Sequence, residues 1–225
     1  MTGRTLIAAI VCLALAAPLF AGDIVAMPTG NFVQPRHLEF NGIWWKMPPA
    51  GTNGDIMIGE AFVGVTDRVE VDVLDAYVRG PNTNVTEVNA YLNVIKETAD
   101  HPGLIVGCTN VMGASWLGGG KFGGPPSNDD PSFLVLTSYN LAAPEVPSFH
   151  DPLIRLHLGW GDNWHQSKLF GGVQFKVYPT FGGAILNYQG SPAYMLTWAP
   201  CKNWELTGGT LQGSTFFRVG AFTKF

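Results

Sequence analysis

The sequence predicts an all-β protein, an antiparallel up-and-down β-barrel of about 12 strands within a range of roughly 10 to 14. Three observations support this fold class. Apolar side chains alternate with polar or small ones along most of the 225 residues. Only 13% of the residues are charged, and the mean hydropathy is positive at +0.14. Beyond the N-terminal segment, no apolar run reaches the ~18 residues that a membrane-spanning helix needs.

The alternation is clearest over residues 153–161. Ile154, Leu156 and Leu158 share one face there, whereas Arg155 and His157 share the other. Because successive side chains of a strand point to opposite faces, the segment has one apolar and one polar face. The pattern continues to the last residue of the sequence, and we interpret a final strand that ends on an aromatic residue as typical of a bacterial outer-membrane barrel.

Twelve segments are expected to be strands, and many have the ~9–11 residues that cross a bilayer when tilted. They cover residues 36–46, 55–63, 68–78, 86–96, 103–112, 131–140, 152–161, 168–178, 182–189, 192–198, 202–208 and 214–225. Segment 55–63 has the weakest pattern, because Glu60 interrupts the face that carries Ile56 and Phe62. Longer connectors are expected at the outer end and tight turns at the periplasmic end. Connector 142–151 departs from that rule, because it is expected at the periplasmic end but is long.

Residues 1–22 have the features of a cleaved secretory signal peptide, which leaves 23–225 as a single barrel domain. Arg4 supplies the positive start, residues 6–15 supply an apolar run, and Ala21 and Gly22 offer a cleavage point. The alternative is a retained anchor helix, for which the apolar run is short compared with the ~20 residues of a span.

The composition argues against several classes of function. The net charge is −4 and no Lys/Arg cluster occurs, so nucleic acid is not an expected partner. No Gly-x-Ser-x-Gly turn is present, and we expect neither enzymatic activity nor a cofactor. Outside the N-terminal segment, Cys108 and Cys201 either form a disulfide or serve as small apolar strand residues.

Polar residues on the strands predict a hydrated interior. His157 shares a face with Arg155, which would repel a metal cation, so no metal site is expected. Carboxylates gather at Glu60, Asp67, Glu70, Asp72, Asp75 and Glu87. A glycosidase needs two carboxylates ~5–9.5 Å apart across a cleft, and neighbours on one strand do not indicate such a cleft. A hydrated barrel lumen explains the same residues without chemistry.

The alternation assigns side chains to two faces of the barrel wall. The residues expected to face the lumen are Arg155, His157, Gln174, Lys176, Arg218 and Lys224. The residues expected to face lipid are Ile154, Leu156, Leu158, Val173, Phe175, Val177, Phe217 and Val219. Aromatic residues near strand ends are expected to form interfacial girdles, with sugar binding or core packing as the alternative: Trp44, Trp45, Trp160, Trp164, Tyr178, Phe181, Tyr188, Trp198 and Trp204.

Short motifs resemble the YjbH-like family of bacterial outer-membrane β-barrel proteins linked to exopolysaccharide production. They are Met-Pro-Thr-Gly at 27–30, Gly-Val-Thr-Asp-Arg-Val-Glu-Val at 64–71, Leu-His-Leu-Gly-Trp-Gly-Asp at 156–162, Leu-Phe-Gly-Gly-Val-Gln-Phe at 169–175 and Tyr-Pro at 178–179. The resemblance implies no catalytic residues. The final segment also resembles the C-terminal signal of the barrel-assembly machinery, through Phe217, Val219, Ala221 and Phe225.

The expected function is that of a structural or transport-associated protein of the bacterial outer membrane, exported through the secretory pathway. Exopolysaccharide export and porin-like solute passage both stay open. Expected partners are outer-membrane lipids, the assembly machinery during biogenesis, and polysaccharide. The first alternative is a secreted, soluble β-sandwich or barrel that binds carbohydrate, because alternation does not distinguish an apolar outside from an apolar inside. The second alternative is an exported hydrolase.

Overall fold

The computed structural model describes residues 35–46, 55–78, 83–98, 100–112, 131–142, 154–162, 168–178, 180–188, 190–201, 203–211 and 213–224. The expected signal peptide at 1–22 therefore lies outside the described residues. The described residues form β1 His37–Lys46, β2 Asp55–Gly64, β3 Val69–Val78, β4 Thr83–Ile95, β5 Gly103–Thr109, β6 Ser132–Ala142, β7 Ile154–Gly161, β8 Lys168–Tyr178, β9 Phe181–Tyr188, β10 Ser191–Cys201, β11 Trp204–Leu211 and β12 Ser214–Lys224. Among the described residues, no helix is long and apolar enough to span a membrane.

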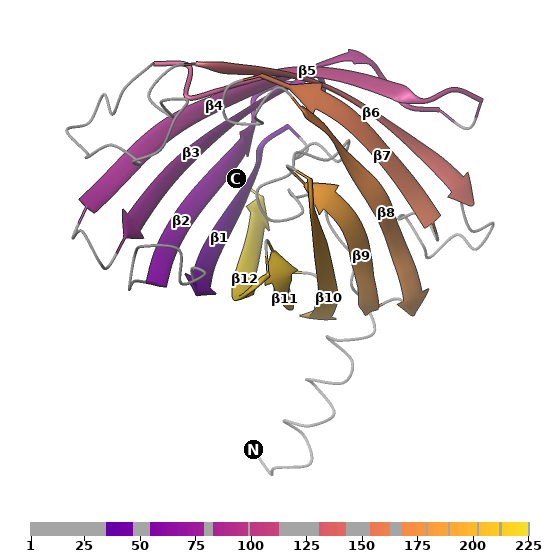
Figure 1. Ribbon diagram of the computed structural model, residues 1–225. Helices are drawn as coiled ribbons and strands as arrows, with labels where there is room; N and C mark the ends of the chain where they lie inside the picture. The colour runs from indigo at the N-terminus through magenta and orange to yellow at the C-terminus, as the bar shows by residue number, and fades with distance from the viewer. Residues whose placement is uncertain are drawn as a thin grey trace, which may run out of the picture.

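The twelve strands close into one barrel (Figure 1). Each strand pairs antiparallel with the next strand in the sequence, and β12 returns to pair with β1. The closing seam runs from the His37–Lys224 pair to the Trp45–Phe216 pair. Closure leaves no open sheet edge. The predicted fold class, an all-β up-and-down barrel of about twelve strands, is confirmed.

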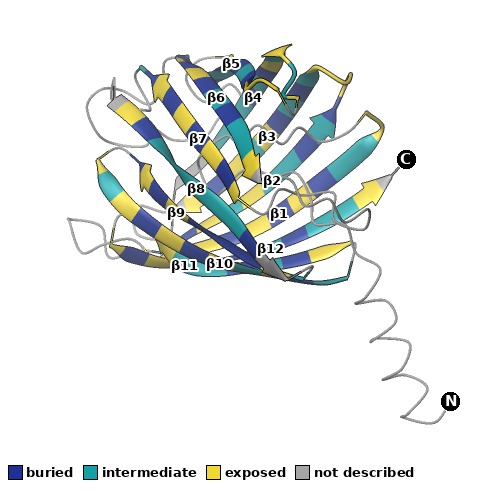
Figure 2. Cartoon of the chain, turned by 90° about the vertical axis from the view of Figure 1, so that its right-hand side faces the viewer, coloured by how far each residue is buried: buried dark blue, intermediate teal, exposed yellow. Residues whose placement is uncertain are grey.

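Along most strands buried residues alternate with more exposed ones, as the stripes in Figure 2 show. In β7 the alternation is complete: Ile154, Leu156 and Leu158 are exposed, whereas Arg155 and His157 are buried. The buried face points into the barrel, because a closed sheet shields its inner side chains from solvent.

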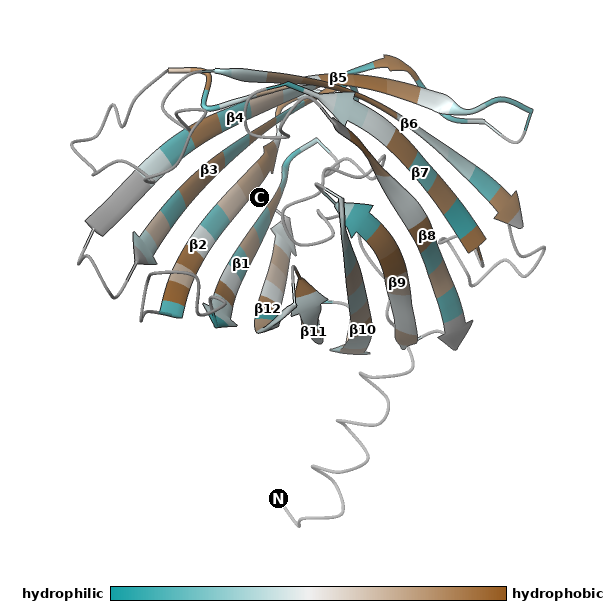
Figure 3. Cartoon of the chain, in the orientation of Figure 1, coloured by the Kyte–Doolittle hydropathy of each residue, from teal (hydrophilic) through white to brown (hydrophobic). Residues whose placement is uncertain are grey.

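Hydrophobic and hydrophilic residues alternate along the strands (Figure 3). The large exposed side chains of the strands are apolar, whereas most of the charged side chains on the strands are buried. Among the described strands, the charged residues that register places on the outer face are Lys46, Asp55 and Asp75. Lys46 and Asp55 form the last pair at the barrel end that carries connector 47–54, whereas Asp75 pairs with Gly59 nearer the middle of the wall. The large apolar side chains exposed on strands include Phe40, Trp44, Met57, Val73, Tyr77, Leu92, Phe133, Val135, Leu156, Leu158, Trp160, Leu169, Ile185, Tyr194, Leu196, Trp198, Trp204 and Phe217.

The interior is not polar throughout. Buried apolar side chains from β4–β6 and β8–β12 form one continuous cluster: Tyr91, Ile105, Leu134, Leu136, Phe170, Ala184, Leu186, Tyr188, Ala193, Met195, Leu211 and Phe216. Within it the rings of Phe170 and Tyr188 meet edge to face, with centroids 6.0 Å apart, a favourable aromatic geometry. The hydrated interior expected from the sequence is therefore restricted to other parts of the wall.

Two of the aromatic residues expected in girdles lie inside instead. Trp45 packs against the interior apolar clusters, and Tyr188 is buried within one of them. Trp44 and Trp45 are consecutive in β1, so they must point to opposite faces. Trp44, Trp160, Phe181, Trp198 and Trp204 are exposed on the outside. Trp164 and the side chain of Tyr178 lie outside the described part of the chain.

The apolar residues of β2 also face inward. Ile56 and Phe62 are buried, and they alternate with Met57, which is exposed. Glu60 shares this inward face and lies between Asn41 on β1 and Leu74 on β3.

Candidate functional site

The candidate site is the charged part of the barrel interior. Four of the residues expected to face the lumen are buried inside: Arg155, His157, Lys176 and Arg218. Gln174 is half-buried on the same wall, and register pairs it with Arg155. The side chain of Lys224 is not among those that the structure describes.

The residues expected to face lipid lie on the other face. Ile154, Leu156, Leu158 and Phe217 are exposed to 38%, 38%, 57% and 45%. Val173 and Phe175 are half-buried and pair in register with Leu156 and Ile154, which places them on the outer face. Val219 and Ala221 are half-buried on β12. The side chain of Val177 and the whole of Phe225 are not described.

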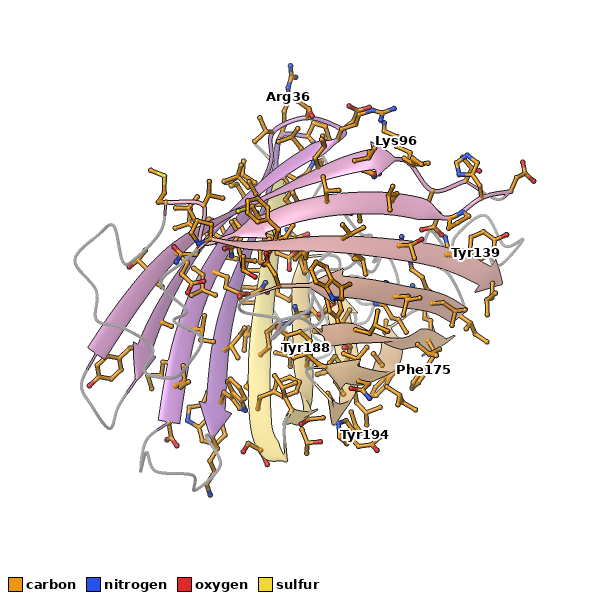
Figure 4. The ribbon with its side chains drawn as sticks, turned by 45° about the horizontal axis from the view of Figure 1, so that its top comes forward. Arg36, Lys96, Tyr139, Phe175, Tyr188 and Tyr194 are labelled. Carbon is orange, nitrogen blue, oxygen red and sulfur yellow. The ribbon has the colours of Figure 1, made fainter. Side chains whose placement is uncertain are left out.

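Figure 4 shows the two faces through labelled residues: Tyr188 lies within the ring of strands and Tyr194 at its outer edge. Arg36 and Lys96 lie at one end of the barrel. That end also carries the β2–β3 turn, where Arg68 donates hydrogen bonds to the carbonyl oxygens of Asn93 and Val94. These two carbonyls belong to an irregular stretch of β4, where register shifts between Asn93 and Ile95.

One interior wall, on β7 and β8, is basic. Arg155 forms a buried ion pair with Glu97 and donates to the Ser138 hydroxyl at 3.1 Å. The His157 ring contacts Gln174 Oε1 at 3.4 Å. Lys176 continues the same wall along β8. The wall therefore carries cationic groups from two adjacent strands.

Glu97 reaches this wall because β5 is short. The last β5–β6 pair joins Gly103 to Ser138, so β6 extends beyond its neighbour. The Asn140 backbone N–H donates to Glu97 Oε1 at 2.7 Å, and the Ser138 hydroxyl donates to Oε2 at 3.2 Å. The Glu97 carboxylate thus accepts the hydrogen bonds of the part of β6 that has no β5 neighbour. It also neutralises Arg155.

The opposite side of the ring is acidic. Inward carboxylates lie on β1, β2, β3, β4 and β11: Glu39, Glu60, Glu70, Asp72, Glu87 and Glu205. Glu70 and Asp72 are both buried, as their shared strand face predicts. Sequence reasoning missed Glu39 and Glu205. The pattern that identifies them is local: each alternates with large apolar residues, Leu38 and Phe40 around Glu39, and Trp204 and Leu206 around Glu205.

Hydrogen bonds hold the acidic wall in place. Asn89 donates to Asp72 Oδ2 at 2.6 Å, and the Asn110 backbone N–H donates to Asn89 Oδ1 at 2.8 Å. Arg218 on β12 forms a buried ion pair with Glu205, which also accepts from the Thr207 hydroxyl at 3.2 Å. Buried charges that are paired and hydrogen-bonded avoid most of the cost of leaving water.

The described residues offer little support for a metal site or a disulfide. They contain no group of three or more His, Cys, Asp or Glu that is arranged to hold a metal ion. His150 and His165 lie outside the described ranges. Cys108 and Cys201 are free thiols, so the alternative of a disulfide between them is wrong. What the arrangement provides is an interior with Arg155, His157 and Lys176 on one side and most of the inward carboxylates on the other.

Comparisons with known proteins bear on the fold. No protein-family model matches the chain, and no curated protein sequence matches it. The solved structure of the KdgM porin matches with a TM-score of 0.52 and 11% identity, covering 84% of this chain and 99% of the porin. The N-terminal β-barrel domain of OprF from Pseudomonas aeruginosa matches with a TM-score of 0.27 and 11% identity, covering 85% and 100%. The likeness to the KdgM porin supports the closed antiparallel β-barrel fold.

Proposed function

We propose that this protein is a non-enzymatic β-barrel of the bacterial outer membrane that passes small solutes in the manner of a porin. The observation that carries the proposal is the distribution of charge. Among the described strands, the charged residues on the outer face are Lys46, Asp55 and Asp75, whereas charged side chains line two interior walls. A soluble protein rarely exposes so large an apolar surface, which argues against the secreted carbohydrate-binding alternative.

Closure of the sheet supports the same proposal. Lipid provides no hydrogen-bond partners for backbone groups, so a sheet that spans a membrane has to close on itself. The β1–β12 seam satisfies the edges of both strands. Exposed aromatic residues near strand ends, such as Trp44, Trp160, Trp198 and Trp204, suit the two interfaces between lipid and water.

Exopolysaccharide is the cargo that the resemblance to the YjbH-like family suggests. The ring of Trp45, which faces inward and is only partly buried, is the kind of flat apolar surface on which a sugar can pack. Deletion of the gene should then lower the amount of exopolysaccharide released into the medium, while the lipid and protein content of the outer membrane stays the same. Unchanged release would limit the proposal to small solutes.

Assembly of the barrel is proposed to depend on the outer face of the last strand. Phe217, Val219, Ala221 and Phe225 would form the segment that the barrel-assembly machinery recognises. Replacement of Phe217 by Ser should lower the amount of folded protein in the membrane, and Phe133→Ser, which removes an exposed aromatic residue from the outer face of β6, is the matched control.

Membrane fractionation combined with gel mobility of unheated and heated samples tests the location. An outer-membrane barrel should sediment with the outer membrane and migrate differently when the sample is not heated. Purified protein should then raise the conductance of a planar bilayer. Recovery in the soluble fraction without detergent, with no heat-dependent shift, would contradict the proposal.

A further inference from the structure

The charged residues on the outer face of the described strands are confined to three adjacent strands. Lys46 lies on β1, Asp55 on β2 and Asp75 on β3, and these strands pair side by side (Figure 1). Lys46 and Asp75 are exposed, and Asp55 is half-buried. A charged side chain on a wall that faces hydrocarbon is costly and commonly marks a functional contact. We call the outer surface of β1–β3 the charged face.

Asp75 is the least expected of the three residues, because it lies away from the strand ends. It pairs with Gly59, the fifth of the ten residues of β2. The Thr86 hydroxyl donates to Asp75 Oδ1 at 2.8 Å. No described residue donates a hydrogen bond to Asp75 Oδ2. Since lipid chains have no donors, the carboxylate needs a cation or a donor from another molecule.

The centre of the charged face is low. Gly42 on β1 and Gly59 on β2 pair with each other in the row that contains Asp75. A Cβ added at either glycine would meet nothing within 4 Å. Larger apolar side chains beside them, such as Phe40 and Met57, are 47% and 57% exposed. Small residues between larger ones allow the backbone of a neighbouring molecule to approach closely.

Lys46 is a cation that matches Asp75, but within one barrel the two residues are separated by β2. Lys46 forms no ion pair with a described residue. A row of paired residues runs from Val78, at the end of β3, through β2 and β1 to Arg155, near the start of β7. Each row therefore slopes toward the other end of the barrel, and β1 lies lower than β3 within it.

This slope brings Lys46 close to the height of Asp75. Lys46 is four residues beyond the row of Asp75. Four residues along a tilted strand amount to ~10 Å of height, and the slope across two strands offsets ~6 Å of it. The remaining ~4 Å is within reach of the flexible stem of a lysine side chain.

We propose that the charged face is the contact between two copies of this barrel in the membrane. Copies inserted by the same route have the same orientation, so their two-fold axis is parallel to the membrane normal. An axis beside Gly59 brings the two glycines together and places β1 of each copy opposite β3 of the other. Lys46 of each copy then lies opposite the partner's Asp75, and two symmetric ion pairs form. The inference rests on the proposed function in one respect, namely that the outer face lies in lipid.

Cross-linking in the outer membrane tests which face forms the contact. Gly59→Cys is made in a chain in which Cys12, Cys108 and Cys201 are replaced by alanine, and a short bismaleimide linker is added. Gly208→Cys is the matched control, because Gly208 is an outer-face glycine on β11 and its Cβ would meet nothing closer than 3.9 Å. Gly59→Cys should give a dimer band on a denaturing gel, whereas Gly208→Cys should stay monomeric.

The ion pair is tested by sedimentation equilibrium in density-matched detergent. Asp75→Asn removes the charge and keeps an oxygen for Thr86, and it should raise the dimer Kd roughly threefold to thirtyfold, as expected for a polar contact within a membrane. Asp67→Asn removes a carboxylate from an exposed turn and should leave the Kd unchanged. The double variant Lys46→Asp with Asp75→Lys should bind more tightly than either single variant, since each pair then has its charges exchanged. A heat-dependent gel shift shows that each variant has folded.

Two results would overturn the contact. One is equal cross-linking of Gly59→Cys and Gly208→Cys, and the other is an unaltered barrel that sediments as a monomer. A monomer that sediments with the outer membrane and shows the heat-dependent shift would leave the proposed function in place. Recovery without detergent, in the soluble fraction, would instead contradict the proposed function. Equal Kd values for Asp75→Asn and Asp67→Asn would overturn the ion pair.

Discussion

At the scale of single residues, Arg218 is the cation on which the acidic wall depends. Its guanidinium is buried and paired with Glu205, and on β12 it lies two residues from Gly220, which pairs with Asn41 in register. Removal of one partner of a buried ion pair leaves the other charge uncompensated, which costs far more than loss of an exposed pair. The Arg218–Glu205 pair should therefore dominate the energetics of this wall.

Arg218→Met should lower the free energy of unfolding by about 3–5 kcal/mol, because the carboxylates of the wall lose their cation. Urea unfolding of the barrel in lipid vesicles measures the change. Addition of Glu205→Gln to that variant should recover part of the loss, since one uncompensated charge disappears. A double variant that is less stable than Arg218→Met alone would show that the pair is not the source of the effect.

Asp67 gives a prediction about pH. The hydrogen bond from Lys96, together with its positive charge, lowers the pKa of Asp67 below its ordinary value of 3.8. A lowered pKa in the folded state means that the contact stabilises the turn above pH 3.8 and is lost as the pH falls through the depressed pKa. A ¹³C NMR titration of the Asp67 carboxyl should show a midpoint below 3.8 in the unaltered protein and a higher one in Lys96→Met. Equal midpoints would contradict the assigned cause.

At the scale of elements, the close approach of β8 and β9 depends on glycine. A Cβ at Gly172 would meet the backbone oxygen of Ile185 and would lie 2.7 Å from the Cα of Leu186. Backbone atoms cannot move away without separating the strands. By contrast, a Cβ at Gly42 on the outer face would meet nothing within 4 Å.

Gly172→Ala should destabilise the barrel by about 1–3 kcal/mol through overpacking, whereas Gly42→Ala should have little effect. Unfolding midpoints of the two variants in the same detergent provide the comparison. If both substitutions were equally tolerated, the strand contact around Gly172 would have to be looser than the structure shows.

The positions of strands were more predictable from the sequence than their orientation. A period of two identifies a strand wherever one face is apolar and the other is not, as in β7. In β2 the inward side carries Ile56 and Phe62 and the outward side Met57, so both faces are partly apolar. Alternation alone does not decide which face is inside there. The sequence likewise does not show which of the consecutive residues Trp44 and Trp45 points inward. The pairing of β1 with β2 and β12 decides it.

The candidate site was predictable only in part. Each of the four inward cations or rings alternates with apolar neighbours, so its strand face could be assigned one strand at a time; they are Arg155, His157, Lys176 and Arg218. The acidic wall required knowledge that β11 and β12 return to β1. Glu205 and Glu39 are far apart in the sequence, and only closure of the barrel brings them to one side. Glu97 lies in a connector, where periodicity provides no information.

At the scale of the whole molecule, the membrane location depends on which face of the wall is hydrophobic. Arginine on the lipid face of an outer-membrane barrel costs about 2–4 kcal/mol at the bilayer midplane, whereas arginine facing the interior costs much less. Leu158 is exposed on the outer face of β7. Leu74 is half-buried on the inner face of β3, and register places it between Glu60 and Glu87.

Leu158→Arg and Leu74→Arg therefore make the same chemical change on opposite faces. Leu158→Arg should destabilise the barrel in lipid vesicles by about 2–4 kcal/mol, because the guanidinium would enter hydrocarbon. Leu74→Arg should cost less, since two carboxylates flank the new cation and offset the lost packing. Unfolding in urea with lipid present measures both. A Leu158→Arg variant that is as stable as the unaltered protein would indicate that this face meets water, and the lipid-facing outer wall would then have to be abandoned.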